Sequence, residues 1–207
     1  MLAQALLRQG RPVETLGAVG RAVACSRETD VPAFTASALT DRAVALGGLA
    51  QYPAALRDLA EADKLVARIE DLRLADQVRL GMLITSALVH RAVGEPAVTA
   101  VLAEQAMELC ERHGRREQYL QAKMAWALAL VEIGEDERAV AAGRQVYQEL
   151  LNRGTPHLAA LAAISLAALD GRAGRLARPG PGPGGRCGWS TRGISTPGEP
   201  PGSTSPG

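Results

Sequence analysis

Apolar residues recur every three or four positions along most of this chain, the spacing that places them on one face of an α-helix. Short stretches containing proline, glycine or aspartate separate the apolar runs. Proline is tolerated in the first turn of a helix, and glycine favours the left-handed residue that follows a helix end. The pattern therefore predicts helices at residues 2–9, 12–29, 31–49, 52–70, 72–93, 96–113, 115–133, 135–153 and 156–170.

The turns between these helices form two interleaved series with a common period. One series runs through Gly10, Ala50, Gly94, Gly134 and Gly174, and the other through Asp30, Asp71, Gly114 and Gly154. Successive members of each series lie about 40 residues apart, which indicates a repeated pair of helices. Such a repeat is typical of a helical solenoid, in which each pair packs on its neighbours. The residues expected to cap helix N-termini are Asp30, Asp71 and Thr155.

The residues around the first series of turns carry a family resemblance. Each copy has an apolar helix end, a Gly or Ala turn, and a second helix with small residues at helical spacing, as in ALGGLAQYPAALRDLAEAD and LALVEIGEDERAVAAGRQVY. The second-helix positions are Ala55, Leu56, Leu59 and Ala62 after Tyr52, and Ala139 and Val140 after Gly134. Over residues 1–177 this pattern resembles tetratricopeptide repeats.

The resemblance implies an all-α fold, a right-handed α-α superhelix of about four antiparallel helix hairpins, known as a TPR-like solenoid. Small residues at the quoted positions would let the two helices of a hairpin pack closely. The period exceeds the usual length of about 34 residues. In this respect the chain is similar to long-helix variants found in regulatory regions of large bacterial signalling proteins and transcription activators.

Composition changes abruptly at residue 178. The last 30 residues contain 9 Gly and 7 Pro and have no Ala, Leu or Val, so they offer too little apolar surface to offset the entropy of ordering. We therefore expect a helical repeat domain at 1–177 and a disordered tail at 178–207. The segment GRAGRLA before the tail opens a helix that the tail interrupts, which indicates an array cut within a repeat. A genuine linker and a truncated or frame-shifted product both fit this composition.

Charge and cysteine content narrow the classes of function. The 23 basic and 22 acidic side chains leave a net charge of +1, which provides no overall field to gather nucleic acid or anionic lipid. Cys25, Cys110 and Cys187 are too few and too widely spaced for a disulfide framework, so a reducing compartment is expected. The longest uncharged run, residues 154–169, has 16 residues, short of the roughly 18 to 20 of a membrane span. We expect a cytoplasmic protein that binds neither nucleic acid by itself nor a membrane.

The sequence shows no arrangement typical of a catalytic site. Cys110 and His113 lie three residues apart on one predicted helix and could share a metal ion, but two further ligands are missing. His90 has no identifiable partner for acid–base chemistry, so it is expected to be packed or to face a groove. We therefore predict no enzyme activity, no metal site and no cofactor.

A basic turn and one tryptophan are the remaining candidates for partner binding. The turn contains Arg112, His113, Arg115 and Arg116. These cations could contact an acidic partner or a phosphate; the favoured interpretation is that they offset the helix dipole and pair with Glu111 and Glu117. Trp126 could be an interface anchor, although a tryptophan in such a helix is more often part of the core. The candidate partner-binding residues are therefore His90, Arg112, Arg115, Arg116 and Trp126.

These observations predict a protein–protein interaction scaffold that binds a protein or peptide partner. The alternative hypothesis is a severed regulatory or sensory region of a bacterial signalling enzyme, for example a diguanylate cyclase, or of a transcription activator. The apolar character of residues 156–170 also predicts self-association through this helix. The side chains expected to be exposed there are Leu158, Leu161, Ile164, Leu166 and Leu169.

Overall fold

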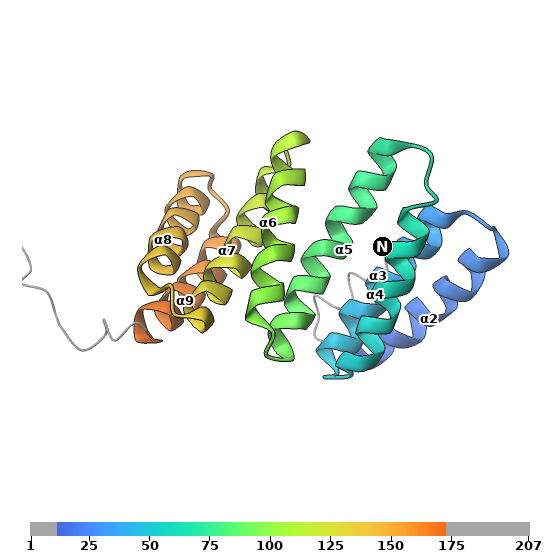
Figure 1. The fold of residues 1–207 in the computed structure, drawn as a ribbon, viewed down its shortest axis with the longest axis horizontal. Helices are drawn as coiled ribbons and strands as arrows, with labels where there is room; N and C mark the ends of the chain where they lie inside the picture. The colour runs from blue at the N-terminus through green and yellow to red at the C-terminus, as the bar shows by residue number, and fades with distance from the viewer. Residues whose placement is uncertain (1–11, 173–207) are drawn as a thin grey trace, which may run out of the picture. The chain divides into compact units, whose positions relative to one another are not determined.

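A computed structural model describes residues 12–172 of the chain, and every regular element in that range is an α-helix (Figure 1). In chain order the helices are α2 (Pro12–Glu28), α3 (Pro32–Gly48), α4 (Tyr52–Val66), α5 (Leu72–Ala92), α6 (Pro96–Arg112), α7 (Arg116–Ile133), α8 (Asp136–Asn152) and α9 (Pro156–Arg172). Each helix predicted within this range is present. The predicted helix at 2–9 and the tail at 178–207 lie outside the described residues.

Most turns between these helices share one backbone conformation. A residue with positive φ follows the helix end in all but one of them, and these residues are Asp30, Ala50, Gly94, Gly114, Gly134 and Gly154. The next amide then bonds back to a carbonyl of the last helical turn, for example Glu135 N to Leu130 O at 2.8 Å and Arg115 N to Cys110 O at 2.8 Å. This is the Schellman arrangement, which satisfies carbonyls that the helix leaves unpaired. The glycines therefore end helices as the sequence predicted.

Asp30 and Thr155 differ from their predicted roles as caps. Asp30 has φ 49° and ends α2, whereas Val31 is the N-cap residue of α3 and makes no side-chain cap bond. Aspartate tolerates the left-handed conformation better than most residues, so it can take the place of glycine here. The Thr155 hydroxyl donates to the Leu150 carbonyl at 3.0 Å, at the end of α8.

The connection between α4 and α5 is the exception among the turns. Helix α4 ends at Val66, four residues before the predicted end at 70. Helix α5 then begins at the N-cap Asp71, whose Oδ1 accepts hydrogen bonds from the amides of Arg73 at 2.9 Å and Leu74 at 3.2 Å. The predicted cap at Asp71 is therefore confirmed, and it satisfies two amides that the helix itself cannot pair.

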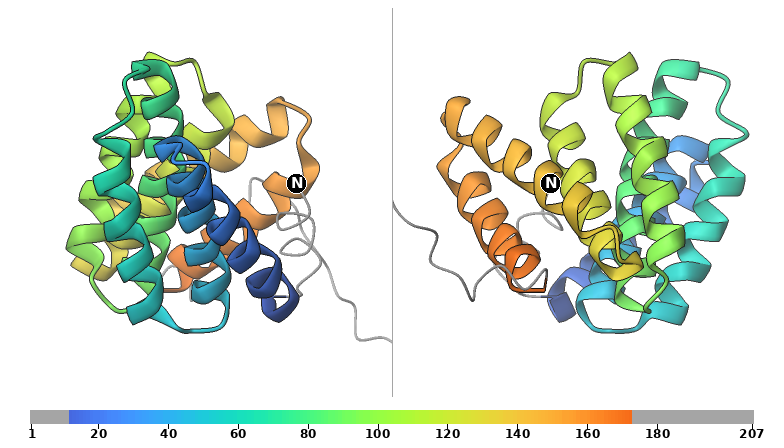
Figure 2. Two further views of the ribbon diagram at one scale, coloured as in Figure 1. Left: turned by 90° about the vertical axis from the view of Figure 1, so that its right-hand side faces the viewer. Right: turned by 60° about the vertical axis from the view of Figure 1, so that its left-hand side comes forward.

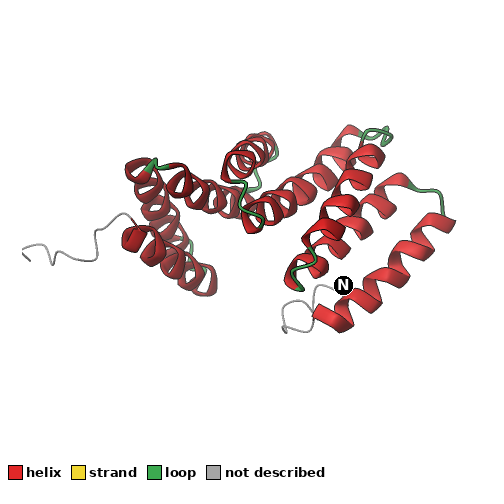
Figure 3. Cartoon of the chain, turned by 60° about the horizontal axis from the view of Figure 1, so that its bottom comes forward, coloured by secondary structure: helices red, strands yellow, loops and turns green. Residues whose placement is uncertain are grey.

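Helices that follow one another in the chain pack as antiparallel neighbours, and two rows result (Figures 1 and 2). The first helices of the hairpins contact each other in order, α3 on α5, α5 on α7 and α7 on α9. The second helices, α2, α4, α6 and α8, do not pack against one another, although Arg27 of α2 and Glu61 of α4 form an exposed ion pair at 2.7 Å. Short loops join the helices, and the described range contains no strand (Figure 3). The first helices therefore form a continuous surface of their own.

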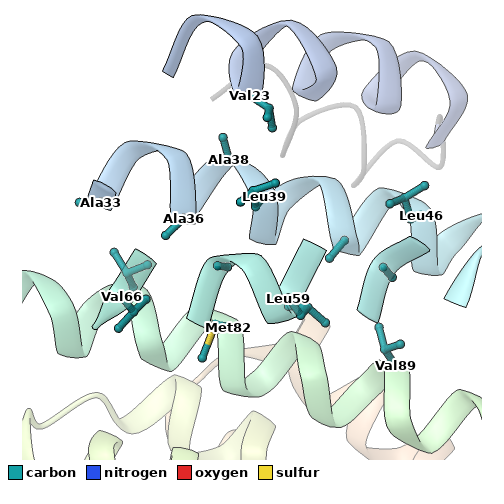
Figure 4. Close-up of a cluster of buried hydrophobic side chains, with 14 of the residues drawn as sticks. Val23, Ala33, Ala36, Ala38, Leu39, Leu46, Leu59, Val66, Met82 and Val89 are labelled. Atoms are coloured by element: carbon teal, nitrogen blue, oxygen red, sulfur yellow. The ribbon is translucent and has the colours of Figure 1, made fainter. Parts of the chain in front are cut away.

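Small side chains dominate the core between the rows. Ala55, Ala62 and Ala139 are fully buried, as the repeat pattern predicted, and Leu59 is also buried. One apolar cluster joins α2 to α5, including Leu39, Leu59 and Met82 (Figure 4). Two further clusters join α5 to α7 and α7 to α9. Alanine at these positions lets neighbouring helix backbones approach closely. Because each cluster joins helices that follow one another in the chain, each helix is held mainly by its immediate neighbours.

The exposed surface of α9 differs in part from the prediction. Leu161 and Ile164 are 61% and 69% exposed, as expected, and Leu158 and Leu166 are half-buried. Leu169 was expected to be exposed, but it is fully buried because it packs on Gly143 of α8, where no side chain occupies the space. Self-association through residues 156–170 stays a prediction.

No helix in the described range is suited to span a membrane. None combines the length and the low charge content needed to cross a bilayer.

Candidate functional site

An apolar groove lies on the surface formed by the first helices of the hairpins. It has a volume of about 390 Å³ and is lined by residues of α5, α7, α8 and α9. We call this set of residues the inner groove: Ile84, Leu88, Arg91, Glu117, Leu120, Gln121, Met124, Ala125, Leu128, Val146, Leu150, Leu158, Leu161, Ala162 and Ser165. Most of its lining is apolar, as in pockets that bind small molecules or peptide side chains.

Helical spacing explains how these side chains come together. Ile84, Leu88 and Arg91 lie three or four residues apart on α5, so they share one face of that helix. Gln121, Ala125 and Leu128 do the same on α7. Helices α5 and α7 contact each other much less than each contacts α6. The two faces therefore stay separate enough to leave the groove open.

The floor and the rim of the inner groove differ in exposure. Leu120, Val146 and Leu150 form part of a buried floor, where they belong to the α7–α9 core cluster. At the rim Leu88 is 50% exposed and Leu161 is 61% exposed. Single exposed leucines are ordinary, but these two lie at the edge of one apolar hollow with a buried floor. This combination is what a binding site for apolar side chains requires.

A second hollow adjoins the first and is basic. Its volume is about 730 Å³, and we call its lining the basic end: Arg73, Asp76, Gln77, Leu80, Gly81, Ile84, Arg112, His113, Arg115 and Gln118. Ile84 lines both hollows, so the two adjoin at this residue of α5. The basic end lies where α5 and α7 begin and α6 ends.

Asp76 is the acidic residue of the basic end, and it has several cationic neighbours. Its Oδ2 accepts a hydrogen bond from Nε2 of His113 at 2.8 Å and lies 3.8 Å from Nη1 of Arg112. Arg79 approaches its other carboxylate oxygen at 3.9 Å. Arg73 and Arg115 form no ion pair with any described residue. The basic end therefore keeps a net positive charge after Asp76 is counted.

The structure brings together two of the arginines predicted to bind a partner and separates the third. Arg112 and Arg115 both line the basic end. Arg116 instead bonds through Nε and Nη2 to both carboxylate oxygens of Glu149 at 2.5 Å, and its guanidinium lies 4.5 Å from the centre of the Tyr119 ring. Within the described residues, the ion pairs of Arg112 and Arg116 are with Asp76 and Glu149. The favoured interpretation that they pair with Glu111 and Glu117 is therefore wrong.

His90 and Trp126 are outside the inner groove. Nδ1 of His90 donates to Glu95 at 2.6 Å across the α5–α6 turn, and the next residue, Arg91, lines the groove instead. Trp126 is half-buried; its Nε1 donates to Glu104 of α6 at 2.8 Å, and the Arg138 guanidinium of α8 lies 5.4 Å from its ring. Both side chains therefore connect neighbouring helices.

Residues that sequence reasoning did not select include Arg73, Leu88 and Arg91. The sequence feature that could have identified them is a spacing of three or four residues, which places one set of side chains on the same face of α5: Arg73, Gln77, Leu80, Ile84, Leu88 and Arg91. Arg91 has a buried Nε without a hydrogen bond, and the same atom lies 3.6 Å from Glu132. The groove depends on several helices, so this spacing alone does not reveal it.

Cys110 and His113 occupy different environments. Cys110 is buried in the α5–α7 cluster, and burial raises the pKa of its thiol to about 11. His113 faces Asp76 in the basic end. Across the part of the chain that the structure describes, no group of three or more His, Cys, Asp or Glu side chains is placed to hold a metal ion.

No protein-family model matches the chain, and no curated protein is significantly similar to it in sequence.

Proposed function

We propose that the helical array is a protein–protein interaction scaffold of the tetratricopeptide-like kind, and that a peptide segment of its partner binds in the inner groove. The observation that supports this proposal is the pairing of a buried apolar floor with the exposed rim residues Leu88 and Leu161. Apolar side chains of a partner would bury these two rim residues. Removal of apolar surface from water is the main favourable term in most protein association.

The packing of the helices supports the tetratricopeptide-like assignment. The first helices pack on one another in order, whereas the second helices do not, and this arrangement is typical of a superhelix in which one row of helices forms a continuous face. The fully buried Ala55, Ala62 and Ala139 match the small residues on which the resemblance rests. A regulatory region of a bacterial signalling enzyme or transcription activator would present the same face, so this alternative stays a prediction.

The proposal can be tested by selecting peptides on the full chain. A phage-displayed library of random 16-residue peptides is selected on the wild-type protein, and the affinity of the most enriched peptide is measured by fluorescence anisotropy. The double variant Leu88→Glu with Leu161→Glu should bind that peptide at least about tenfold more weakly, because two charges would lie against its apolar side chains.

Val101→Glu is the matched control for this experiment. Val101 is 53% exposed on α6 and lines neither hollow, so its substitution places a glutamate at a comparable apolar position away from the groove. We expect its affinity for the peptide to equal that of the wild type. Equal losses in the control and the groove variant would contradict the proposal, as would a selection that enriches no peptide.

A further inference from the structure

Charge is distributed unevenly over the two adjoining hollows, so an occupant of both would bind in one direction. Arg73, Arg112 and Arg115 gather at one end, where Asp76 is the acidic lining residue. Fifteen positions along α5 separate Arg73 from Leu88, about 22 Å at 1.5 Å per residue. An extended peptide covers that distance in about seven residues. An occupant that fits both hollows therefore needs carboxylates at one end and apolar side chains at the other.

The terminal segments of this chain do not have that composition. Residues 1–11 contain no acidic side chain. Residues 173–207 contain Glu199 as their one acidic side chain, together with Arg175, Arg178, Arg186 and Arg192. In both segments cationic side chains outnumber acidic ones. Charge complementarity therefore favours a separate molecule over these segments.

We propose that the site takes a peptide segment in which a cluster of Asp or Glu residues binds at the basic end, and Leu, Ile, Phe or Met residues bind in the inner groove. This inference rests on the proposed function and specifies the chemistry of the partner. Arg73 and Arg115 supply the attraction for the carboxylates, since neither forms an ion pair with another described residue. Carboxylates pair well with the planar guanidinium group.

Charge reversal provides the test. The same 16-residue library is selected on the full-length wild type and on the double variant Arg73→Glu with Arg115→Glu. Both positions are exposed, at the first turn of α5 and the N-cap of α7, where an acidic residue suits the helix dipole and should not disturb folding. The wild type should enrich Asp and Glu beside apolar residues, and the variant should enrich Lys and Arg in their place.

The matched control carries the same change of net charge elsewhere. Arg21 of α2 and Arg57 of α4 are exposed and line neither hollow, so the variant Arg21→Glu with Arg57→Glu should select the same acidic peptides as the wild type. A wild-type peptide should bind the Arg73 and Arg115 variant about tenfold more weakly, and rising salt should reduce this difference because exposed charges are screened.

The outcomes separate this inference from the proposed function. If wild type and charge-reversal variant select peptides of the same charge, while the groove variant with Leu88→Glu and Leu161→Glu loses them, the acidic specificity is refuted and the scaffold remains. If the wild type selects no peptides, both proposals fail. Preference for acidic peptides in the Arg73 and Arg115 variant would also overturn the inference.

Discussion

Arg42 of α3 and Asp58 of α4 face each other across the α3–α4 hairpin and share two hydrogen bonds, from Nε to Oδ2 at 2.6 Å and from Nη2 to Oδ1 at 2.7 Å. The side chains are 26% and 10% exposed, so this pair joins a first helix to a second helix at a mostly buried point. Arg27 and Glu61 form a second pair, between α2 and α4, but both of these side chains are about half exposed. The two acidic residues lie three positions apart on one helix.

Replacing Asp58 with Ala should lower the free energy of unfolding by about 1.5 to 3 kcal/mol, because the partly buried Arg42 loses both hydrogen bonds. Glu61→Ala removes the exposed pair and should cost less than about 1 kcal/mol. Urea denaturation followed by circular dichroism measures both changes. Equal losses for the two variants would show that the Arg42–Asp58 pair is no stronger than a surface contact.

The pair between Arg116 and Glu149 should make stability depend on acid pH. Hydrogen bonding to the Arg116 guanidinium holds the pKa of Glu149 below its ordinary value of 4.5. A lowered folded-state pKa means that the ionised form is stabilised by folding. The contribution is therefore complete above the ordinary pKa and is lost as the pH falls through the lower folded value.

Thermal unfolding of wild type and Glu149→Gln at several pH values checks this dependence. The difference in Tm should be largest near neutral pH, should begin to shrink as the pH falls below the ordinary pKa of 4.5, and should be lost once the pH falls through the lower folded-state pKa. Glu108→Gln is the control, since Glu108 is exposed and forms no ion pair with any described residue. A Glu149→Gln difference that stays constant with pH would contradict the assignment.

Gly143 lets α8 and α9 approach each other closely. A Cβ atom at this position would lie 2.8 Å from Cδ1 of Leu169, which is itself fully buried. Gly143→Val should therefore destabilise the protein by about 1 to 3 kcal/mol through overpacking. Gly20→Val is the control, because a Cβ at Gly20 meets no atom within 4 Å, and this variant should be close to neutral. Denaturant unfolding that ranks the two variants in the opposite order would refute the close contact.

The thiol of Cys110 should be unreactive in the folded protein. Burial raises its pKa to about 11, so little thiolate is present at pH 8 and reagents cannot reach it. A variant with Cys25→Ser and Cys187→Ser isolates Cys110 for titration with a disulfide reagent. We expect no native-state reaction on the timescale in which exposed Cys25, isolated in the Cys110→Ser and Cys187→Ser variant, reacts fully. If the isolated Cys110 and Cys25 thiols reacted at equal rates, burial of Cys110 in the core would be contradicted.

Local sequence signals predict the helices well because their causes are local. Pro32 and Pro96 occupy first-turn positions, and Gly94, Gly134 and Gly154 adopt the left-handed conformation that ends a helix. Asp30 and Ala50 show the limit of that reasoning: they adopt the same conformation without being glycine. The repeat spacing, rather than residue type, identifies these two as turn positions.

The basic turn shows why the site is harder to predict. Arg115 and Arg116 are adjacent in sequence, yet one lines the basic end and the other bonds to Glu149, 33 residues further on. Pairing with the local glutamates was the favoured interpretation because nearest neighbours are visible in a sequence. Partners such as Asp76 and Glu149 become available only once several helices have packed, so they cannot be identified from spacing along one helix.

The groove itself is also a product of packing between repeats. Leu88 and Leu161 lie on α5 and α9, and their separate helical patterns resemble those of any amphipathic helix. The groove exists because the surfaces of α5, α7 and α9 meet without filling the space between them. Sequence reasoning identified Leu161 as exposed but associated it with self-association, since the facing residues of α5 were not known.

Methyl NMR of the full-length protein bound to a selected peptide tests the central claim most directly. With methyl groups of Leu and Val assigned by substitution, we expect the largest peptide-induced shifts at Leu88, Leu128 and Leu161 of the inner groove. Val101 of α6 and Leu151 of α8 are also exposed but line neither hollow, so their signals should remain unchanged. Shifts concentrated at Val101 and Leu151, with Leu88 and Leu161 unaffected, would contradict binding in the groove.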